Sequence, residues 1–263
     1  AMLTHSNIYS NVIQEALWFP GFNFGQESVM AVLPFFHVFA MTVVMNLGIY
    51  KGAKLIMHPR FELLPVLKDI HTKHPTFMAG VPSMYNAILN NPNLSKYNLN
   101  SLKACISGGA PLPLDVKKGF ERLTGCTLVE GYGLTETAPV ACANPMDGEN
   151  KENSVGLPMP KTSITITDKD DPAKILTQGE IGEICISGPQ VMKGYWKRPE
   201  VTSEIIVEGR FRSGDVGYLD EDGYTFIIDR IKDLVLVNGF NVYPRNVEEG
   251  IYKHPAVEEV TVI

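Results

Sequence analysis

Short apolar segments alternate with helical patterns through the first half of the chain, and this order constrains the fold more than any other feature. Five segments are candidate strands, namely 29–34, 53–57, 76–80, 103–107 and 127–131. The stretches between them predict helices near 38–47, 62–73, 83–90 and 113–124, and Pro111 and Pro113 mark the start of the last one. Because strands that alternate with helices usually pair in parallel, the sequence predicts an α/β fold with a mainly parallel sheet flanked by helices.

The pattern changes after about Asn144. Apolar and polar residues alternate in 162–168, 180–188 and 216–229, and Asp222-Gly223 is a hairpin signal. These segments predict a β-rich, barrel-like subdomain of antiparallel strands. The segment 257–263 also has the composition of a strand.

The composition is that of a globular protein without a general affinity for nucleic acid. Apolar residues make up 44% of the 263 residues, charged residues 20%, and the formal net charge is −6. A chain with this charge does not attract nucleic acid or phosphates as a whole. A polyphosphate ligand would therefore need a local site or a magnesium ion.

The cysteines and the long uncharged segment bear on where the protein works. The four cysteines are far apart and form no CxxC pair, which predicts reduced, buried residues of a cytoplasmic protein. The segment 28–50 carries no formal charge and is long enough to span a bilayer. However, Pro34, His37, Asn46 and Gly48 interrupt it, and polar groups are costly in lipid. We expect a buried strand and helix there, no transmembrane segment, and no signal peptide at the first residues.

Two glycine-rich loops follow neighbouring candidate strands. Gly108-Gly109 comes after 103–107, and the stretch 130-EGYGLTETAP-139 follows the next strand without any lysine or arginine. Ligands bind at the carboxyl ends of parallel strands, and glycines let a ligand approach the backbone. The second loop suits a ligand that brings both negative charge and a metal ion, as a nucleotide does. The alternative is a polar turn capped by Thr135.

Further along, three side chains could bind a ribose or phosphate. Asp215 follows a glycine, and its carboxylate can accept two hydrogen bonds from adjacent ribose hydroxyls. Arg230 and Lys232 could bind phosphate or ribose oxygens. Equally, Asp215 could be a turn residue, and the two cations could pair with the aspartates beside them.

Several motifs in one order and spacing are more specific than any single loop. They are 107-SGGAPL-112, 131-GYGLTET-137, 182-GEICISGPQVMKGYWKRPE-200, 213-SGDVGYLDEDG-223 and 229-DRIKDLVLVNGFNVYPRNVEE-249. With these motifs the chain resembles the adenylate-forming acyl-CoA synthetases. The segments 33–41 and 238–249 are most similar to long- and medium-chain fatty-acid–CoA ligases. An aryl-CoA ligase, a carrier-protein-loading adenylation domain and a non-catalytic nucleotide-binding remnant stay open as alternatives.

The resemblance implies an activity and a set of ligands. Family members use ATP to convert a carboxylate into an acyl-adenylate and pyrophosphate, and then transfer the acyl group to the thiol of coenzyme A. Fatty acid, ATP and coenzyme A would be the substrates, with Mg²⁺ as the metal. Three domains are implied: 1–144 and 145–229 as the α/β and β-rich parts of the large AMP-binding domain, and 230–263 as the hinge and start of a mobile domain.

The resemblance also assigns roles to individual residues. Glu136 would bind Mg²⁺, Thr135 the α-phosphate, and His37 would lie near the reacting carboxylate. Asp215 would bind the ribose diol, with Arg230 beside it. The remaining assignments are the adenine and acyl contacts Gly108, Gly109 and Ala110, the base-stacking Tyr132 with Gly133 in the same loop, the hinge residue Lys232, and Gly239 at the pantetheine tunnel.

The family pattern continues beyond both ends of these residues. A phosphate loop would precede Ala1, and a lysine that contacts the α-phosphate would follow Ile263. We therefore expect the 263 residues alone to bind nucleotide weakly and to be inactive. Many relatives form homodimers, and a long-chain acid substrate would allow peripheral membrane contact.

Overall fold

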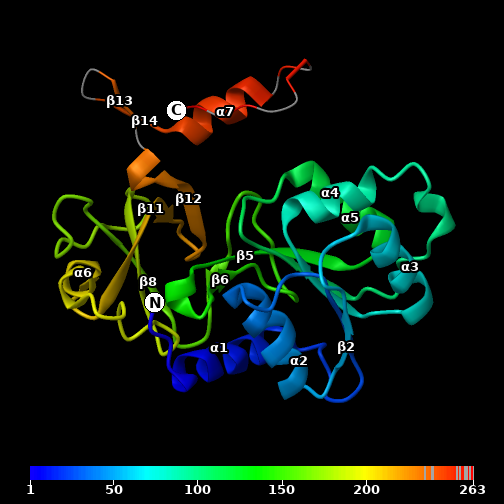
Figure 1. Ribbon diagram of the computed structural model, residues 1–263. Coiled ribbons are helices and arrows are strands. Elements are labelled where there is room, and N and C mark those ends of the chain that lie inside the picture. The colour runs from blue at the N-terminus through cyan, green and yellow to red at the C-terminus, as the bar shows by residue number, and fades with distance from the viewer. Residues whose placement is uncertain are drawn as a thin grey trace.

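A seven-stranded sheet forms the centre of the first half of the chain (Figure 1). The computed structural model describes residues 1–233, 235–237, 240–252, 254, 256, 257, 260 and 262. The strand order is β2-β1-β3-β4-β5-β6-β7, and the first five strands pair in parallel. Their bounds are β1 Ser28–Ala31, β2 Lys54–Met57, β3 Phe77–Gly80, β4 Ala104–Ser107 and β5 Thr127–Gly133. The predicted α/β class and mainly parallel sheet are confirmed.

Two short strands extend this sheet in the antiparallel direction. β6 (Val140–Ala143) pairs with β5, and β7 (Leu157–Pro158) pairs with β6. The chain reverses between β5 and β6 through a single 3-10 turn, η3 (Thr135–Thr137). The reversal therefore lies at the carboxyl end of a parallel strand, where ligands of such sheets bind.

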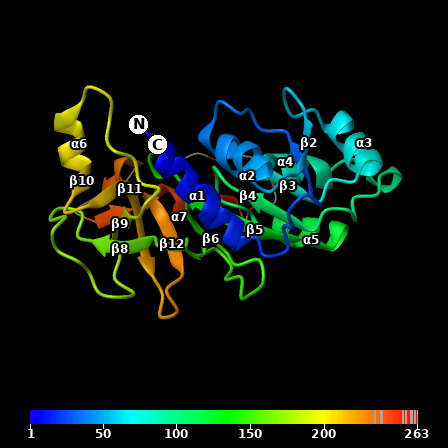
Figure 2. The same ribbon diagram turned by 90° about the horizontal axis from the view of Figure 1, so that it is seen from below.

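Helices cover both faces of the sheet, because successive side chains of each strand point to opposite faces. Val29, Phe77 and Ile106 pack beneath α1 (His5–Trp18), η1 (Ala40–Asn46) and α2 (Leu47–Tyr50). Met30, Met78 and Leu128 pack on the other face, against α3 (Leu63–Lys73), α4 (Pro82–Leu89) and α5 (Leu114–Thr124). The helix expected at 38–47 begins at Ala40 as the π-helix η1 (Ala40–Asn46). In Figure 2, the view from below, α1 lies in front of the central sheet.

The second half forms the predicted antiparallel sheet. Its strand order is β10-β11-β9-β8, and β12 pairs with the later part of β11, from Asp215 to Leu219, beyond the residues that pair with β10. The bounds are β8 Ser163–Thr167, β9 Gly182–Ser187, β10 Ile206–Val207, β11 Arg210–Leu219 and β12 Thr225–Arg230, and α6 (Pro199–Ile205) precedes β10. The hairpin predicted at Asp222-Gly223 joins β11 to β12.

The last described elements lie above this sheet in Figure 1. They are the 3-10 turn η4 (Ile231–Asp233), the hairpin strands β13 (Val235–Val237) and β14 (Phe240–Val242), and α7 (Pro244–Tyr252). Val257, Val260 and Val262 are not in a strand, and the other residues of the strand expected at 257–263 lie outside the described residues. The division of the chain at residues 144 and 229 stays a prediction.

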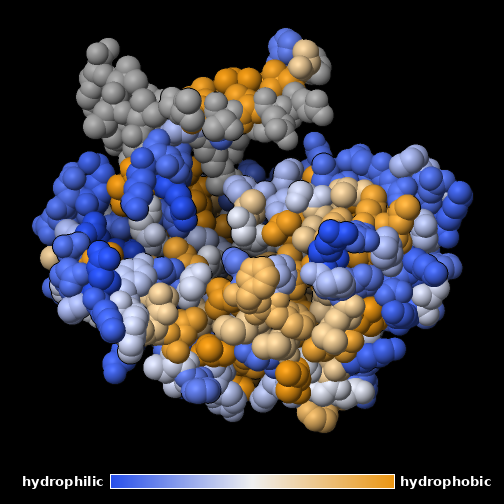
Figure 3. All heavy atoms as spheres, in the orientation of Figure 1, coloured by the Kyte–Doolittle hydropathy of each residue, from blue (hydrophilic) through white to orange (hydrophobic). Residues whose placement is uncertain are grey.

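Apolar side chains are exposed on the face that carries α1 and α2. Tyr9 and Leu17 of α1 and Ile49 of α2 are 61%, 66% and 66% exposed. Figure 3 shows apolar residues gathered on the lower part of this face. Among the described residues, no helix combines the length and apolar character needed to cross a bilayer.

Candidate functional site

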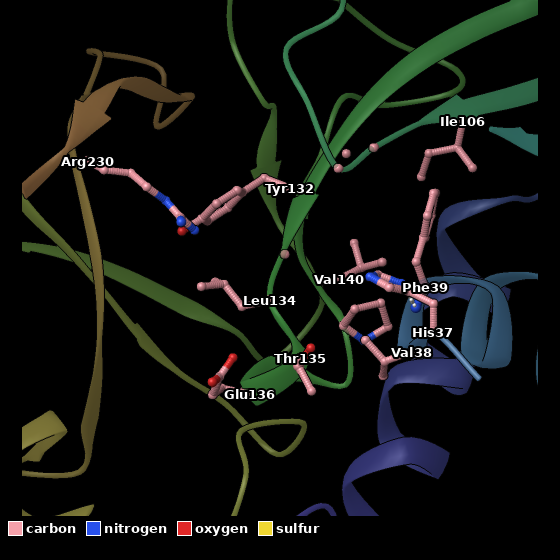
Figure 4. A pocket seen from close by; sticks show the side chains of 15 residues that line it. His37, Val38, Phe39, Ile106, Tyr132, Leu134, Thr135, Glu136, Val140 and Arg230 are labelled. Atoms are coloured by element: carbon pink, nitrogen blue, oxygen red, sulfur yellow. Dashed lines mark hydrogen bonds between the residues drawn. The ribbon is translucent and has the colours of Figure 1, made fainter. Parts of the chain in front are cut away.

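A cavity of about 290 Å³ lies at the carboxyl ends of β4 and β5, on the side that faces the second sheet. Figure 4 shows its labelled side chains, with Tyr132 and Arg230 on one side and His37 and Phe39 on the other. Its walls come from the loop after β1, the ends of β4 and β5, the η3 turn, and the end of β12. The lining residues are His37, Val38, Phe39, Ile106, Gly108, Gly109, Gly131, Tyr132, Gly133, Leu134, Thr135, Glu136, Pro139, Val140 and Arg230.

The η3 turn presents Thr135 and Glu136 to the cavity. Gly133 allows the turn to close tightly, because a Cβ atom there would overlap the carbonyl group of Pro139. The Leu134 amide donates to Thr137 Oγ1 at 3.0 Å, which fixes the other end of the turn. Thr135 is exposed and Glu136 half-buried. The segment is a polar turn, but Thr137 and not Thr135 makes the side-chain contact that closes it. Its use as a ligand loop stays a prediction.

Contacts from the second half of the chain fix the Glu136 carboxylate. The Tyr195 hydroxyl donates to Glu136 Oε1 at 2.7 Å, and the Met192 amide donates to the Glu136 carbonyl at 2.7 Å. Burial, the hydrogen bond and the Glu136 charge raise the pKa of Tyr195 to about 12. The phenol therefore stays protonated and donates to the carboxylate at neutral pH.

A second polar cluster joins the two sheets beside the same cavity. The Tyr132 hydroxyl donates to Asp215 Oδ2 at 2.5 Å, and Arg230 Nε donates to Asp215 Oδ1 at 3.1 Å. Asp215 is only 4% exposed, and burial together with the Asp215 charge and hydrogen bond raises the pKa of Tyr132. The ion pair of Arg230 is thus with Asp215, 15 residues earlier, on the adjacent strand β11.

The opposite wall of the cavity is apolar except for His37. Phe39, Ile106 and Val140 form this wall, and Val140 is 4% exposed. His37 is exposed at the rim, and its Nδ1 accepts a hydrogen bond from the Phe39 amide at 3.3 Å. The cavity therefore has a polar side and an apolar side, with a histidine at the edge of the apolar one.

Most of the predicted site residues come together here. Gly108, Gly109, Tyr132, Gly133, Thr135, Glu136, His37 and Arg230 line the cavity, and Asp215 contacts two of them. Ala110 follows the lining residue Gly109 and is exposed, Lys232 is exposed in η4, and Gly239 lies outside the described residues. Ile106 and Val140 of the apolar wall and Tyr195 were not assigned from sequence. Tyr195 lies in the motif 182–200, which gives no contact partner.

The donor set limits how a metal ion could bind. In the described part of the chain, no group of three or more His, Cys, Asp or Glu side chains could form a metal cage. Mg²⁺ usually binds through one or two carboxylates together with substrate phosphates. Glu136 fits such a site, because Tyr195 holds only one of its two carboxylate oxygens among the contacts seen.

Known proteins are similar to the chain in both sequence and fold. The sequence model of the family described as AMP-binding enzyme matches residues 1–196. A long-chain-fatty-acid–CoA ligase of Bacillus subtilis is 45% identical over 261 residues, which cover 99% of this chain and 46% of that protein. The chain thus spans about half the length of the curated relatives it matches.

Two solved structures are similar over nearly the whole chain. ATP-bound MatB from Rhodopseudomonas palustris superposes with a TM-score of 0.93 at 36% identity, covering 100% of this chain and 51% of that one. The O-succinylbenzoate coenzyme A synthetase of Bacillus subtilis, in complex with ATP and magnesium ion, gives a TM-score of 0.86 at 29% identity, covering 98% of this chain and 52% of that one.

Proposed function

Because the chain belongs to the family of AMP-binding enzymes, we propose that it is part of an ATP-dependent fatty-acid–CoA ligase. The reaction would join a carboxylic acid to AMP with release of pyrophosphate, and then transfer the acyl group to coenzyme A. The 45% identity to a long-chain-fatty-acid–CoA ligase supports this acid class. The activity belongs to the whole protein, of which the chain carries the cavity and the residues around it.

One observation carries the proposal: the Thr135-Glu136 turn and the Tyr132–Asp215–Arg230 cluster border one cavity although they come from two sheets. A nucleotide needs hydrogen-bond acceptors for its sugar hydroxyls and donors or a metal for its phosphate, separated by the size of AMP. Asp215 would accept hydrogen bonds from the ribose hydroxyls. Thr135 would donate its hydroxyl to the α-phosphate.

A magnesium ion would neutralise phosphate charge when it is bound at Glu136. The chain itself contributes the orientation of that carboxylate. Tyr195 holds Oε1, so the other oxygen faces a defined direction before any ligand arrives. Preorganised groups of this kind lower the barrier because they need no rearrangement during the reaction.

The apolar wall would receive the acid. Phe39, Ile106 and Val140 exclude water from one side of the cavity, and His37 at the rim could donate a hydrogen bond to the carboxylate of the acid. The similarity to an O-succinylbenzoate coenzyme A synthetase supports an aryl acid as the second candidate. Aliphatic and aromatic acids both suit an apolar wall.

Two experiments test the proposal. The 263-residue chain should bind AMP, measured by ligand-observed NMR at millimolar concentration, and Asp215→Ala should weaken that binding. Pyrophosphate release by the whole protein, measured with a panel of fatty and aryl acids, identifies the acid class. Failure of the wild-type chain to bind AMP would refute the nucleotide site, and preference for aryl acids would replace the fatty-acid assignment.

The location and assembly of the protein extend the same proposal. A cytoplasmic protein that forms a homodimer and contacts the membrane surface would suit a ligase of long-chain acids. The exposed side chains of α1 and α2 are compatible with such contacts. Size-exclusion chromatography and vesicle sedimentation of the whole protein measure the two properties separately.

A further inference from the structure

A buried glutamate on strand β9 lies opposite Val216, the residue that follows Asp215. Glu183 is 2% exposed and does not line the cavity. Its Oε2 accepts a hydrogen bond from Arg212 Nε at 2.7 Å, and Arg212 Nη2 forms an ion pair with the same oxygen at 2.7 Å. A buried carboxylate needs such a partner, because burial of an unpaired charge is costly. The ion pair explains how Glu183 can be buried, but it leaves the second oxygen for another contact.

Strand β11 leaves its regular pairing with β9 beside this glutamate. The register shifts between Arg212 and Val216, so the intervening residues do not continue the ladder. Gly214 has a φ of +76°, in the left-handed region that favours glycine. Its amide, turned away from the ladder, donates to Glu183 Oε1 at 3.1 Å.

The interrupted segment ends at the carboxylate that borders the cavity. The Asp215 amide donates to Ser213 Oγ at 3.0 Å, and Ser213 Oγ donates to the Ile184 carbonyl at 2.7 Å. Side-chain contacts thus replace the ladder hydrogen bonds to β9 over these residues, while Asp215 stays paired with Arg230 of β12 on the other side. The direction of the Asp215 side chain depends on this local backbone conformation.

We propose that Glu183 is a positioning residue for the sugar-binding carboxylate: it holds the Gly214 amide and thereby directs Asp215 toward the ligand. This inference rests on the proposed function, because it takes Asp215 as the ribose contact. Without Glu183 the Gly214 amide loses its acceptor and Arg212 loses its counter-charge. The segment then relaxes, and Asp215 no longer meets the two ribose hydroxyls together.

The test compares two nucleotides that differ only in the sugar hydroxyls. AMP and 2′,3′-dideoxy-AMP are titrated into the 263-residue chain by ligand-observed NMR, and the ratio of their affinities measures the contact to the diol. Asp215→Ala gives the ratio without that contact. Glu183→Ala should lower AMP affinity about 10-fold, the lower end of the loss seen when residues that orient metal ligands are removed, and should leave dideoxy-AMP affinity unchanged.

A second variant removes the same contact while keeping the fold. Replacing a buried ion pair by apolar residues is often neutral for stability, so Glu183→Leu with Arg212→Leu removes the acceptor without leaving a buried charge. It should show the same fall in the ratio. Glu183→Gln retains an oxygen acceptor for the Gly214 amide, and it should keep a larger ratio than Glu183→Ala.

Glu27→Ala is the matched control, because Glu27 is also a buried glutamate, 4% exposed and paired with Lys103 at 3.1 Å, and it lines a separate cavity. This variant should lose stability without a change in the ratio. The role of Glu183 would be overturned if Glu183→Ala lowered the affinities for AMP and dideoxy-AMP equally. It would also be overturned if the double variant left the affinity ratio unchanged. If Asp215→Ala itself leaves the ratio unchanged, the proposed ribose contact is wrong, and the inference falls with it.

Discussion

Replacement of Glu15 should change how the stability of the chain depends on pH. Glu15 lies on α1, is 1% exposed, and neither carboxylate oxygen has a hydrogen-bond partner among the described residues. Burial raises the pKa of this carboxyl well above its ordinary value of 4.5. We therefore expect the folded chain to hold a neutral carboxylic acid near neutral pH, which becomes ionised when the chain unfolds.

The sign and size of the effect follow from proton binding. Below the ordinary glutamate pKa both states are protonated, and the full stability is present. Above it the unfolded state binds fewer protons than the folded state, so stability is lost as the pH rises through the raised pKa. The loss is about 1.4 kcal/mol per pH unit for one proton, or about 3 kcal/mol from pH 5 to pH 7 while the folded carboxyl stays protonated.

Urea denaturation at pH 5, 6 and 7 measures this loss in the wild type and in Glu15→Gln, which has nearly the same shape and does not ionise. The advantage of the variant should grow with pH by the slope given above. Wild-type and variant curves that run parallel across this range would refute the reasoning.

Glu27→Gln provides a control of opposite sign. Burial alone would raise the pKa of Glu27, but hydrogen bonds from Thr76 and Lys103 and the Lys103 charge outweigh it, so the pKa is lowered. Stability from this group is present above the ordinary value of 4.5 and is lost as the pH falls through the lowered pKa. The deficit of Glu27→Gln should therefore be constant from pH 5 to pH 7 and shrink only in more acidic solution.

Three further replacements test the core and the site. Phe120→Ala removes a fully buried ring and should lower the free energy of unfolding by about 3–5 kcal/mol in urea denaturation; a loss below about 1 kcal/mol would contradict its place in the core. Gly133→Ala places a Cβ atom against the Pro139 carbonyl and should distort the turn. AMP binding measured by NMR should then be lost, and an affinity equal to that of the wild type would show that the turn adapts. Tyr195→Phe removes the hydrogen bond to Glu136 and should lower the free energy of unfolding by about 1 kcal/mol, measured by thermal or urea unfolding. An unchanged unfolding midpoint would mean that water replaces the phenol hydroxyl.

The parallel sheet could be predicted from sequence because its strands are buried on both faces. Segments such as 29–34 and 103–107 are short, apolar and followed by loops rich in glycine or proline. The helix α1 was not predicted, since its buried side is partly polar. Asn11 donates to the Val140 carbonyl at 2.8 Å and Gln14 to the Pro160 carbonyl at 2.7 Å. These partners are more than a hundred residues away, so hydrophobic periodicity cannot reveal the helix.

The site was predicted unevenly for a related reason. The glycine-rich loops are local in sequence, and Gly108, Gly109, Thr135 and Glu136 could be selected from them. The supporting contacts depend on which strands become neighbours. Glu183 meets Gly214 only because β9 pairs with β11 and the register shifts at that point. A register shift leaves no simple pattern in the amino-acid sequence. The contact between Glu183 and Gly214 could therefore not be predicted from sequence.

The hydrogen bond between Tyr132 and Asp215 has a consequence for how such proteins can recombine. It joins side chains that are 83 positions apart, one from each sheet. A gene crossover between those two codons would combine a tyrosine loop from one parent with an aspartate strand from another. The hybrid protein would form this hydrogen bond only if the two sheets have the same separation in both parents. Crossovers outside residues 132–215 should therefore yield working hybrids more often than crossovers within them.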